Sequence, residues 1–460
     1  MFRLAEDHLA AWVDRSDRLP LVLRGARQTG KSWLIQHLGE RFEGAVAVAN
    51  LEREPGLAAC FASNDPSAVV ALLEASLRRS IVPGRSLLFL DEIQAAPQVL
   101  AKLRWFAEEL PALHVAAAGS LLDFALADHS FSMPVGRISY GHLEPMTFAE
   151  FLRACGEDRL LAAVAACTPA VGVALALHPR LAELARTYAL VGGMPAAVAD
   201  WAEHRSFVRV ADLHRDLLQT FRDDFGKYRR GVDTARVATV FAALPRLVGR
   251  KFQPSAIDRE EKSRSLKDAF RLLSLARVVT PVQRTAANGV PLGAEVDERY
   301  QKVCLLDTGL YATMVGLDAA AVTNLADLTL VNEGQLAEQL VGQELRAVRP
   351  FNQEPGLFTW VRAAKNSNAE VDYVLQVGTR VVPVEVKAGA TGTLRSLHMM
   401  VREKGLDLAV RVNSEPLHSS TVTTSLPVGA QHTFRLLSVP FYLVGELPRL
   451  ILELDRSGGR

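Results

Sequence analysis

The pattern GARQTGKS at residues 25–32 constrains the fold of this chain more than any other feature. It is a complete G-x-x-x-x-G-K-S phosphate-binding loop, preceded by the apolar run 19–23 and followed by helical spacing over 33–42. A strand, a glycine-rich loop and a helix in this order form the context in which such a loop binds phosphate. Glycines let the backbone turn tightly, so successive N–H groups point at one anion beside the positive end of the helix dipole. The sequence therefore predicts a binding site for a nucleoside triphosphate, with ATP and Mg²⁺ as the expected ligands.

Individual residues of this loop receive predicted roles. Lys31 is expected to pair with the β- and γ-phosphates, and the Ser32 hydroxyl to be a ligand of Mg²⁺. The other nucleotide-binding candidates are the remaining loop positions and the residue after the loop, namely Gly25, Ala26, Arg27, Gln28, Thr29, Gly30 and Trp33.

An acidic pair follows a second apolar run, SLLFL at 86–90. Open α/β sheets bind ligands at the carboxyl ends of their strands. We expect Asp91 to hold Mg²⁺ through water, and Glu92 to orient and deprotonate the attacking water. Asp91 as a mere helix cap is the alternative. Ser120, after a third apolar run, is predicted either to sense the γ-phosphate or to cap the next helix, and the two roles are compatible.

Bulk properties set the class of protein. A chain of 460 residues is expected to fold as two to four domains. The net charge of +1 excludes neither nucleic-acid nor protein partners. Four widely spaced cysteines and an N-terminus without an apolar signal core predict a cytoplasmic protein. The apolar stretch 160–177 is interpreted as two short packed helices, with Pro169 near the start of the second, rather than as a membrane span.

Pattern switches along the chain predict its organisation. Apolar strands alternate with helical segments over 1–145, which is typical of an α/β domain with a parallel sheet covered on both faces. A helical region is expected over 146–232, a winged-helix-like region over 233–300 and a nuclease-like α/β domain over 301–460.

The predicted winged-helix-like region carries many basic residues. They are diluted by Asp258, Glu260, Glu261 and Asp268, so DNA contact and a solvated helix face are both open interpretations. The basic residues are Arg246, Arg250, Lys251, Arg259, Lys262, Arg264, Lys267 and Arg271.

A second set of polar residues lies in the C-terminal third. Asp372, Glu385 and Lys387 fit a D-x(12)-E-x-K pattern within αβββαβ-like elements, similar to the PD-(D/E)xK nuclease superfamily. In such a site Asp372 and Glu385 would bind Mg²⁺ and Lys387 would activate water. A helix carboxylate, Glu338 or failing it Glu333 or Glu344, is expected to join them. A surface hairpin with a Glu–Lys pair gives the same letters.

Several longer words resemble a family of prokaryotic AAA-type P-loop ATPases with a C-terminal domain of unknown function. They run from residue 24 to residue 387: RGARQTGKS (24–32), LLFLDEIQ (87–94), AAGSLL (117–122), PVGRISYGHLEPMTFAEFL (134–152), LVGGMP (190–195), LLDTGLY (305–311), EVDYVL (370–375) and VPVEVK (382–387). The resemblance implies an additional-strand (ASCE) P-loop ATPase, a helical or winged-helix middle and a restriction-endonuclease-like end.

The same resemblance implies that Arg137 acts as an arginine finger towards a neighbouring subunit, which would require a homo-oligomer. An ordinary ion pair of Arg137 is the alternative. Two hypotheses about function follow. The protein is an ATPase that couples hydrolysis to DNA binding or processing, or a nucleotide-gated switch that binds a protein or DNA partner without cleaving it.

Overall fold

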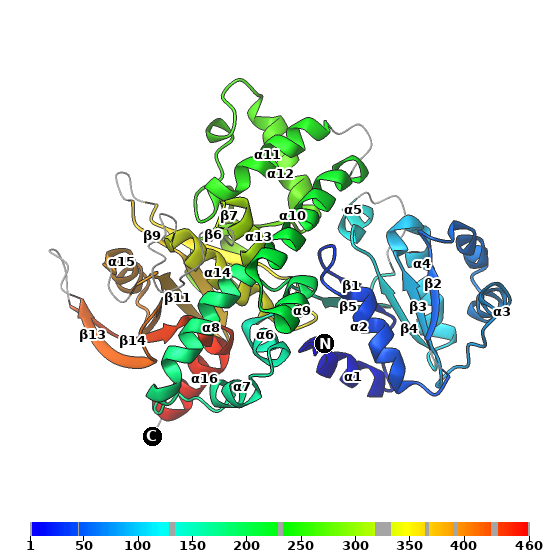
Figure 1. The fold of residues 1–460 in the computed structure, drawn as a ribbon, viewed down its shortest axis with the longest axis horizontal. Coiled ribbons are helices and arrows are strands. Elements are labelled where there is room, and N and C mark those ends of the chain that lie inside the picture. The colour runs from blue at the N-terminus through cyan, green and yellow to red at the C-terminus, as the bar shows by residue number, and fades with distance from the viewer. Residues whose placement is uncertain are drawn as a thin grey trace.

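The computed structural model describes residues 2–44, 46–127, 134–228, 233–317, 333–363, 368–389, 393–424 and 431–458. Figure 1 shows an N-terminal sheet on one side of the molecule, C-terminal sheets on the other, and a helical lobe that projects between them.

The N-terminal part is a parallel α/β sheet, as predicted. Its strands are β1 Leu21–Arg24, β2 Val46–Asn50, β3 Leu87–Asp91, β4 His114–Ala118 and β5 Ser139–His142. Its α-helices are α1 Ala5–Asp14, α2 Lys31–Leu38, α3 Pro66–Leu77, α4 Gln98–Glu109 and α5 Leu122–Ala127. The strand order is β2-β3-β4-β1-β5, with parallel pairing throughout. An additional strand, β4, therefore separates the phosphate-loop strand β1 from the acidic strand β3.

Alternating side chains of these strands build two cores, one on each face of the sheet. Leu21 and Leu23 pack with Leu9 of α1 and Leu34 of α2. Val22, between them in sequence, packs on the opposite face in a core that includes Val69 of α3 and Val99 and Leu103 of α4. Because side chains of a strand alternate in direction, this short apolar run serves both faces.

Helices follow the sheet. They are α6 Phe148–Ala154, α7 Asp158–Ala165, α8 His178–Val191, α9 Pro195–His204 and α10 Phe207–Asp223. Thr147 and Glu150 form a reciprocal capping box that starts α6.

The apolar stretch 160–177 is not one continuous helix. It contains the end of α7 and a 3₁₀ turn, Leu175–Leu177, directly before α8. The prediction that Pro169 starts the second helix was wrong, because Pro179 occupies the first turn of α8. Val171 and Leu175 are largely exposed rather than packed in a core. Among the described residues, the structure contains no helix with the length and apolar character needed to cross a membrane.

The projecting lobe consists of α11 Thr234–Leu247 and α12 Ser263–Leu275 (Figure 1). The antiparallel pair of β6 Val279–Thr285 and β7 Val296–Leu305 follows it. This helix-then-ribbon order agrees with the predicted elements, but β6 also pairs in parallel with β8, Leu357–Val361. Together with β9, Glu370–Val371, the ribbon forms a four-stranded sheet of order β7-β6-β8-β9, so it is not a free wing. The boundary predicted at residue 300 falls inside β7.

The C-terminal part resembles the predicted αβββαβ order, but four strands rather than three separate α14, Glu333–Ala347, from α15, Arg395–Lys404, and further elements follow. Its strands are β8 Leu357–Val361, β9 Glu370–Val371, β10 Tyr373–Val377, β11 Arg380–Val386, β12 Leu408–Asn413, β13 His418–Thr424 and β14 His432–Pro440. Its helices are α13 Thr308–Met314, α14 Glu333–Ala347, α15 Arg395–Lys404 and α16 Leu447–Gly458. The last strand, β14, ends at Pro440, and a 3₁₀ segment begins at Phe441.

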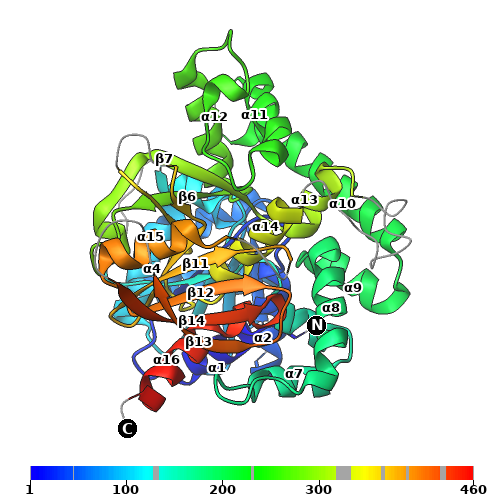
Figure 2. The same cartoon turned by 90° about the vertical axis from the view of Figure 1, so that its left-hand side faces the viewer.

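Five of these strands form the sheet β10-β11-β12-β14-β13, which faces the viewer in Figure 2. Leu397, Met400 and Val401 of α15 pack on one side of this sheet. A second, continuous core joins Val384 of β11 to Leu340 of α14 and to the middle helices. The helical middle and the C-terminal part therefore share one core.

Candidate functional site

The phosphate-loop segment connects β1 to α2, and two glycines shape it. A Cβ atom on Gly25 would lie 2.4 Å from the main-chain oxygen of Leu143, so only glycine fits without a shift. Gly30 has φ +91, a left-handed conformation that side chains rarely adopt. Lys31, the first residue of α2, is buried, and its Nζ donates to Gly25 O at 3.0 Å and Ala26 O at 2.6 Å.

The environment of Lys31 is unusual for a lysine. Its pKa is lowered to about 8, mainly by burial and also by Arg277, although Glu92 and Asp91 partly offset this change. A buried ammonium that relies on main-chain carbonyls is favourably placed to receive an anion, because an anion supplies the missing opposite charge.

Ser32 and Asp91 meet at the carboxyl ends of β1 and β3. Ser32 Oγ donates to Asp91 Oδ1 at 2.9 Å, and Asn50 Nδ2 donates to Asp91 Oδ2 at 3.1 Å. Asp91 therefore does more than cap a helix, because its carboxylate accepts hydrogen bonds from two side chains. Burial raises its pKa. The hydroxyl and carboxylate oxygens are the donors that Mg²⁺ prefers, so these residues fit the expected ion. Asn50 was not a predicted site residue, although it ends β2 at the same edge of the sheet.

The carboxylate of Glu92 accepts hydrogen bonds from neighbouring side chains in this arrangement. Its Oε2 accepts from Gln94 Nε2 at 2.6 Å and from Ser120 Oγ at 3.4 Å. Glu92 itself has φ +50, the left-handed region that ordinary residues seldom occupy. Ser120 is thus close to the predicted base, and α5 begins two residues later.

The other loop candidates contact protein groups. Thr29 Oγ1 donates to Ala26 O at 2.9 Å, and Arg27 forms an ion pair with Asp224. Trp33 is 42% exposed and stacks on His37. A residue outside the loop also stabilises it, because Arg3 donates a hydrogen bond to Thr29 O at 2.7 Å. No motif signalled Arg3.

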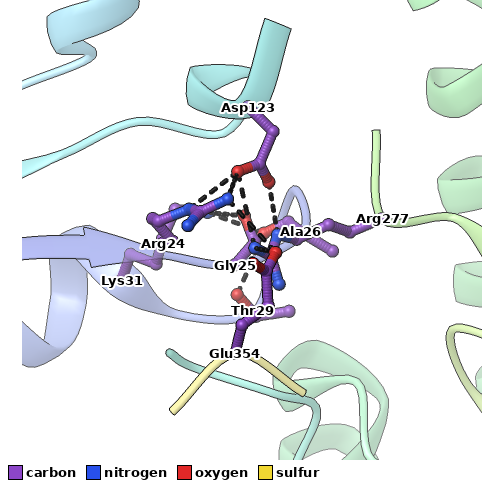
Figure 3. A network of polar contacts seen from close by, with 8 residues as sticks. All are labelled: Arg24, Gly25, Ala26, Thr29, Lys31, Asp123, Arg277 and Glu354. Carbon is purple, nitrogen blue, oxygen red and sulfur yellow. Dashed lines mark hydrogen bonds and ion pairs between the residues drawn. The ribbon is translucent and has the colours of Figure 1, made fainter. Parts of the chain in front are cut away.

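An ion-pair network adjoins the loop, and Figure 3 shows Asp123 of α5 between Arg24 and Arg277. Arg24 ends β1, whereas Arg277 lies between α12 and β6 in a left-handed conformation, φ +58. Both arginines also lie 3.3 Å from Glu354, which precedes β8. Burial alone would raise the pKa of Asp123, but Arg277 and Arg24 lower it below its usual value. Residues from three predicted domains therefore meet beside the phosphate loop, a contact that sequence spacing did not reveal.

Arg137 forms an ion pair with Glu108, with Nε 2.7 Å from Oε1. Its side chain is half exposed. The single chain thus shows the structural contact that was the alternative prediction, and a finger role stays a prediction.

The C-terminal candidates lie together. Tyr373 of β10 pairs with Val384 of β11, which sets Asp372 opposite Glu385. Asp372 lies in the break between β9 and β10, and its Oδ2 accepts from Val386 N at 2.7 Å. Lys387 Nζ lies 2.7 Å from Glu385 Oε1. Burial and the charge of Asp372 raise the pKa of Glu385 to about 7.

A second lysine, which sequence reasoning missed, lies inside this group. Lys302 of β7 is 1% exposed, and its Nζ is 2.5 Å from Glu338, 2.8 Å from Glu370 and 3.9 Å from Asp372. Glu338 of α14 lies in this group through its ion pair with Lys302, and its role as a metal ligand stays a prediction. The only sequence signal for Lys302 was its position as a charged residue next to the apolar run VCLL. We call Lys302, Glu338, Glu370, Asp372, Glu385 and Lys387 the acid cluster.

The reserve candidates on α14 do not join the acid cluster. Glu344 lies elsewhere, because its Oε1 accepts from Phe148 N at 3.0 Å and from Tyr188 Oη at 2.9 Å. The side chain of Glu333 lies outside the described residues.

The acid cluster does not fit Mg²⁺ as it stands. The ammonium of Lys302 occupies the space between Glu338, Glu370 and Asp372, and like charges repel. Within the described ranges, no group of three potential ligands is arranged to hold a metal ion. The expected nuclease-type metal site is therefore not formed in this arrangement.

A cleft of about 1350 Å³ separates the α/β domain from the lobe. Its walls carry charges of both signs, and they include Arg27, Lys227, Asp233, Arg236, Arg264 and Asp268.

Comparisons with known proteins agree with the N-terminal site. Residues 17–152 match a family model described as an AAA domain. Residues 182–321 and 333–426 match models of two domains of unknown function, DUF8612 and DUF4143. The search of curated proteins gave no match. The sheet order, the phosphate loop and the family match together identify residues 17–152 as an AAA-type P-loop ATPase domain.

A comparison with solved structures gave several matches, of which three are described. A Walker-type ATPase of Pyrococcus abyssi is 14% identical, with 68% of this chain and 95% of that chain covered and a TM-score of 0.44. The ORC2 protein of Aeropyrum pernix is 10% identical, with 70% and 96% covered and a TM-score of 0.36. The RuvB Holliday junction branch migration motor of Thermotoga maritima is 12% identical, with 60% and 88% covered and a TM-score of 0.28.

Proposed function

We propose that this protein is a cytoplasmic ATPase that binds ATP with Mg²⁺ at residues 25–32, hydrolyses it, and couples hydrolysis to the binding or processing of DNA. The observation that carries the ATP part is the buried Lys31, whose ammonium donates to two main-chain carbonyls beside the Ser32–Asp91 pair. A triphosphate would replace these weak partners with charged oxygens.

The residues divide the chemistry among them. The main-chain N–H groups of the loop and Lys31 would bind the β- and γ-phosphates. Ser32 and Asp91 would hold Mg²⁺, which when bound neutralises phosphate charge. Glu92 would leave Gln94 and Ser120, turn towards the γ-phosphate and orient the attacking water as general base.

The DNA part of the proposal is supported by the projecting lobe. All eight basic side chains singled out in the sequence are exposed on or beside α11 and α12. One diluting acid is neutralised, because Glu261 pairs with Arg236 at 2.8 Å. An exposed cluster of this kind binds phosphate backbones through local charge, which a near-zero net charge does not prevent.

The test is ATP hydrolysis with and without DNA over a salt series. Stimulation by DNA that fades with salt is expected, because each phosphate contact releases counterions. The double change Arg264→Glu and Lys267→Glu is expected to abolish stimulation and leave basal hydrolysis intact. Arg15→Glu with Arg41→Glu is the matched control, because Arg15 directly follows α1 and Arg41 pairs with Asp14 of that helix. Figure 1 shows α1 away from the lobe. Basal hydrolysis that is lost in Glu92→Gln, together with indifference to DNA, would retain the ATPase and reject the DNA part.

The network at Asp123 favours a second candidate function, a nucleotide-gated switch that binds a protein or DNA partner without cleavage. Asp123, Arg24, Arg277 and Glu354 join the phosphate-loop strand to the lobe and to the C-terminal part (Figure 3). A nucleotide that attracts Arg277 away from Asp123 would change how these parts pack. ATP-dependent changes in protease sensitivity, lost in Asp123→Asn, would support this switch.

A homo-oligomer remains part of the first proposal. Arg137 would then exchange Glu108 for the nucleotide of a neighbouring subunit. Glu108→Ala, which frees Arg137, would leave hydrolysis intact, whereas Arg137→Ala would reduce it only in the assembled state.

A further inference from the structure

The carboxylates around Lys302 come from separate elements. Glu338 lies on α14, Glu370 on β9, and Asp372 at the break before β10. Lys302 itself lies on β7 and is almost completely buried. Carboxylates from three places in the fold thus converge on one ammonium group. Without these carboxylates, the buried charge of Lys302 would be unpaired, at a high cost in free energy.

Most oxygens of these carboxylates are already committed. Glu370 contacts Lys302 through Oε1 and accepts from Tyr300 Oη through Oε2 at 2.7 Å. Asp372 faces Lys302 with Oδ1 and accepts from Val386 N with Oδ2. Glu385 contacts Lys387 through Oε1, whereas its buried Oε2 has no hydrogen-bond partner. A divalent ion that approached these oxygens would lie beside the ammonium of Lys302, and like charges repel.

The backbone keeps Lys302 in this place. Lys302 pairs with Val282 of β6 in the antiparallel ladder, and it forms an isolated bridge with Lys251 on the opposite side. Its neighbour Val303 bridges to Val248, directly after α11. Both edges of the strand are therefore held, and the side chain is directed into the acid cluster by the alternation of the strand.

We propose that Lys302 is an internal cation that takes the place of a divalent metal ion in the acid cluster and keeps the cluster metal-free in the folded chain. The cluster has four carboxylates, and the ammonium groups of Lys302 and Lys387 form ion pairs within it. A divalent ion would have to displace Lys302 from three carboxylates before it could coordinate them. This inference does not rest on the proposed ATPase function.

The experiment counts bound Mn²⁺ by electron paramagnetic resonance in the full-length, nucleotide-free protein. Four forms are compared: wild type, Asp372→Asn, Lys302→Met, and Lys302→Met combined with Asp372→Asn. Wild type and Asp372→Asn are expected to bind equal amounts of Mn²⁺. Lys302→Met is expected to gain one site at least about tenfold tighter than any wild-type site, because a repelling charge has been removed. The double variant should lose that site, which distinguishes the acid cluster from Ser32 and Asp91.

Two results would overturn the proposal. One is a wild-type Mn²⁺ site that disappears in Asp372→Asn, and this comparison holds even if Lys302→Met fails to fold. The other is a folded Lys302→Met protein without a new site. ATP binding, measured on the same samples, reports the integrity of the α/β domain separately, so a failure of the proposed ATPase would be recognised as such.

Discussion

Two lysines of this protein are almost fully buried, and their surroundings give them opposite properties. Lys31 relies on two main-chain carbonyls, and burial lowers its pKa to about 8. Burial would also lower the pKa of Lys302, but Glu338, Asp372 and Glu370 raise it above its usual value. In the described part of the chain, no carboxylate forms an ion pair with Lys31, whereas three surround Lys302.

The difference teaches how a buried cation becomes either a ligand-binding group or a structural one. Desolvation penalises both ammonium groups, and an opposite charge must repay that cost. For Lys302 the protein supplies the charge itself. For Lys31 the opposite charge must come from the ligand, and the positive charge of Arg277 increases the need for an anion. The first arrangement stabilises the fold, and the second stores binding free energy for a triphosphate.

The largest expected effect is on stability. Lys302→Met leaves three carboxylates without their cation, so the free energy of unfolding should fall by about 3–5 kcal/mol. Lys31→Met removes a buried charge that has no ion-pair partner in the native state. The free energy of unfolding should therefore fall by no more than about 1 kcal/mol. Urea unfolding of the nucleotide-free proteins measures both. Equal destabilisation by the two changes would break the comparison.

The next effect concerns ATP affinity. Lys31→Ala removes charge-assisted hydrogen bonds to phosphate, so the Kd for MgATP should rise at least about 100-fold. Titration calorimetry checks this, with Lys102→Ala on α4 as a lysine control that should bind like wild type. Unchanged affinity of Lys31→Ala would remove the basis for placing the triphosphate in this loop.

The smallest effect is a pH dependence. With a pKa of about 8, free Lys31 is charged below that pH and loses its proton above it. Binding an anion favours the charged form, so affinity should be constant below pH 7 and the Kd should rise about fivefold between pH 8 and pH 9. Lys31→Arg keeps its charge and should give a flat profile over this range. A flat wild-type profile would show that the pKa of Lys31 is not lowered.

Much of the α/β domain was predictable because its signals are local. The apolar runs before Gly25 and Asp91 gave buried strands within a residue or two of β1 and β3. The sequence GARQTGKS predicted the loop that connects β1 to α2. Such features depend on neighbours in sequence, where propensity and periodicity act directly.

The C-terminal part was predicted less completely for the opposite reason. The pattern of Asp372, Glu385 and Lys387 gave the hairpin β10–β11, whose register is local. The sheet that β6 and β8 share and the position of Glu344 depend on packing between distant segments. Periodicity within a short window carries no information about such contacts.

The sequence by itself determined a strand–loop–helix unit for phosphate and a parallel sheet around it, because main-chain geometry at glycines and alternation in strands are local properties. Only the tertiary structure decided that Arg277 meets Asp123 beside that loop, and that Lys302 enters a cluster otherwise read as a metal site. The physical reason is that a buried charge is governed by every group within a few ångströms in space, and those groups come from positions far apart in the chain.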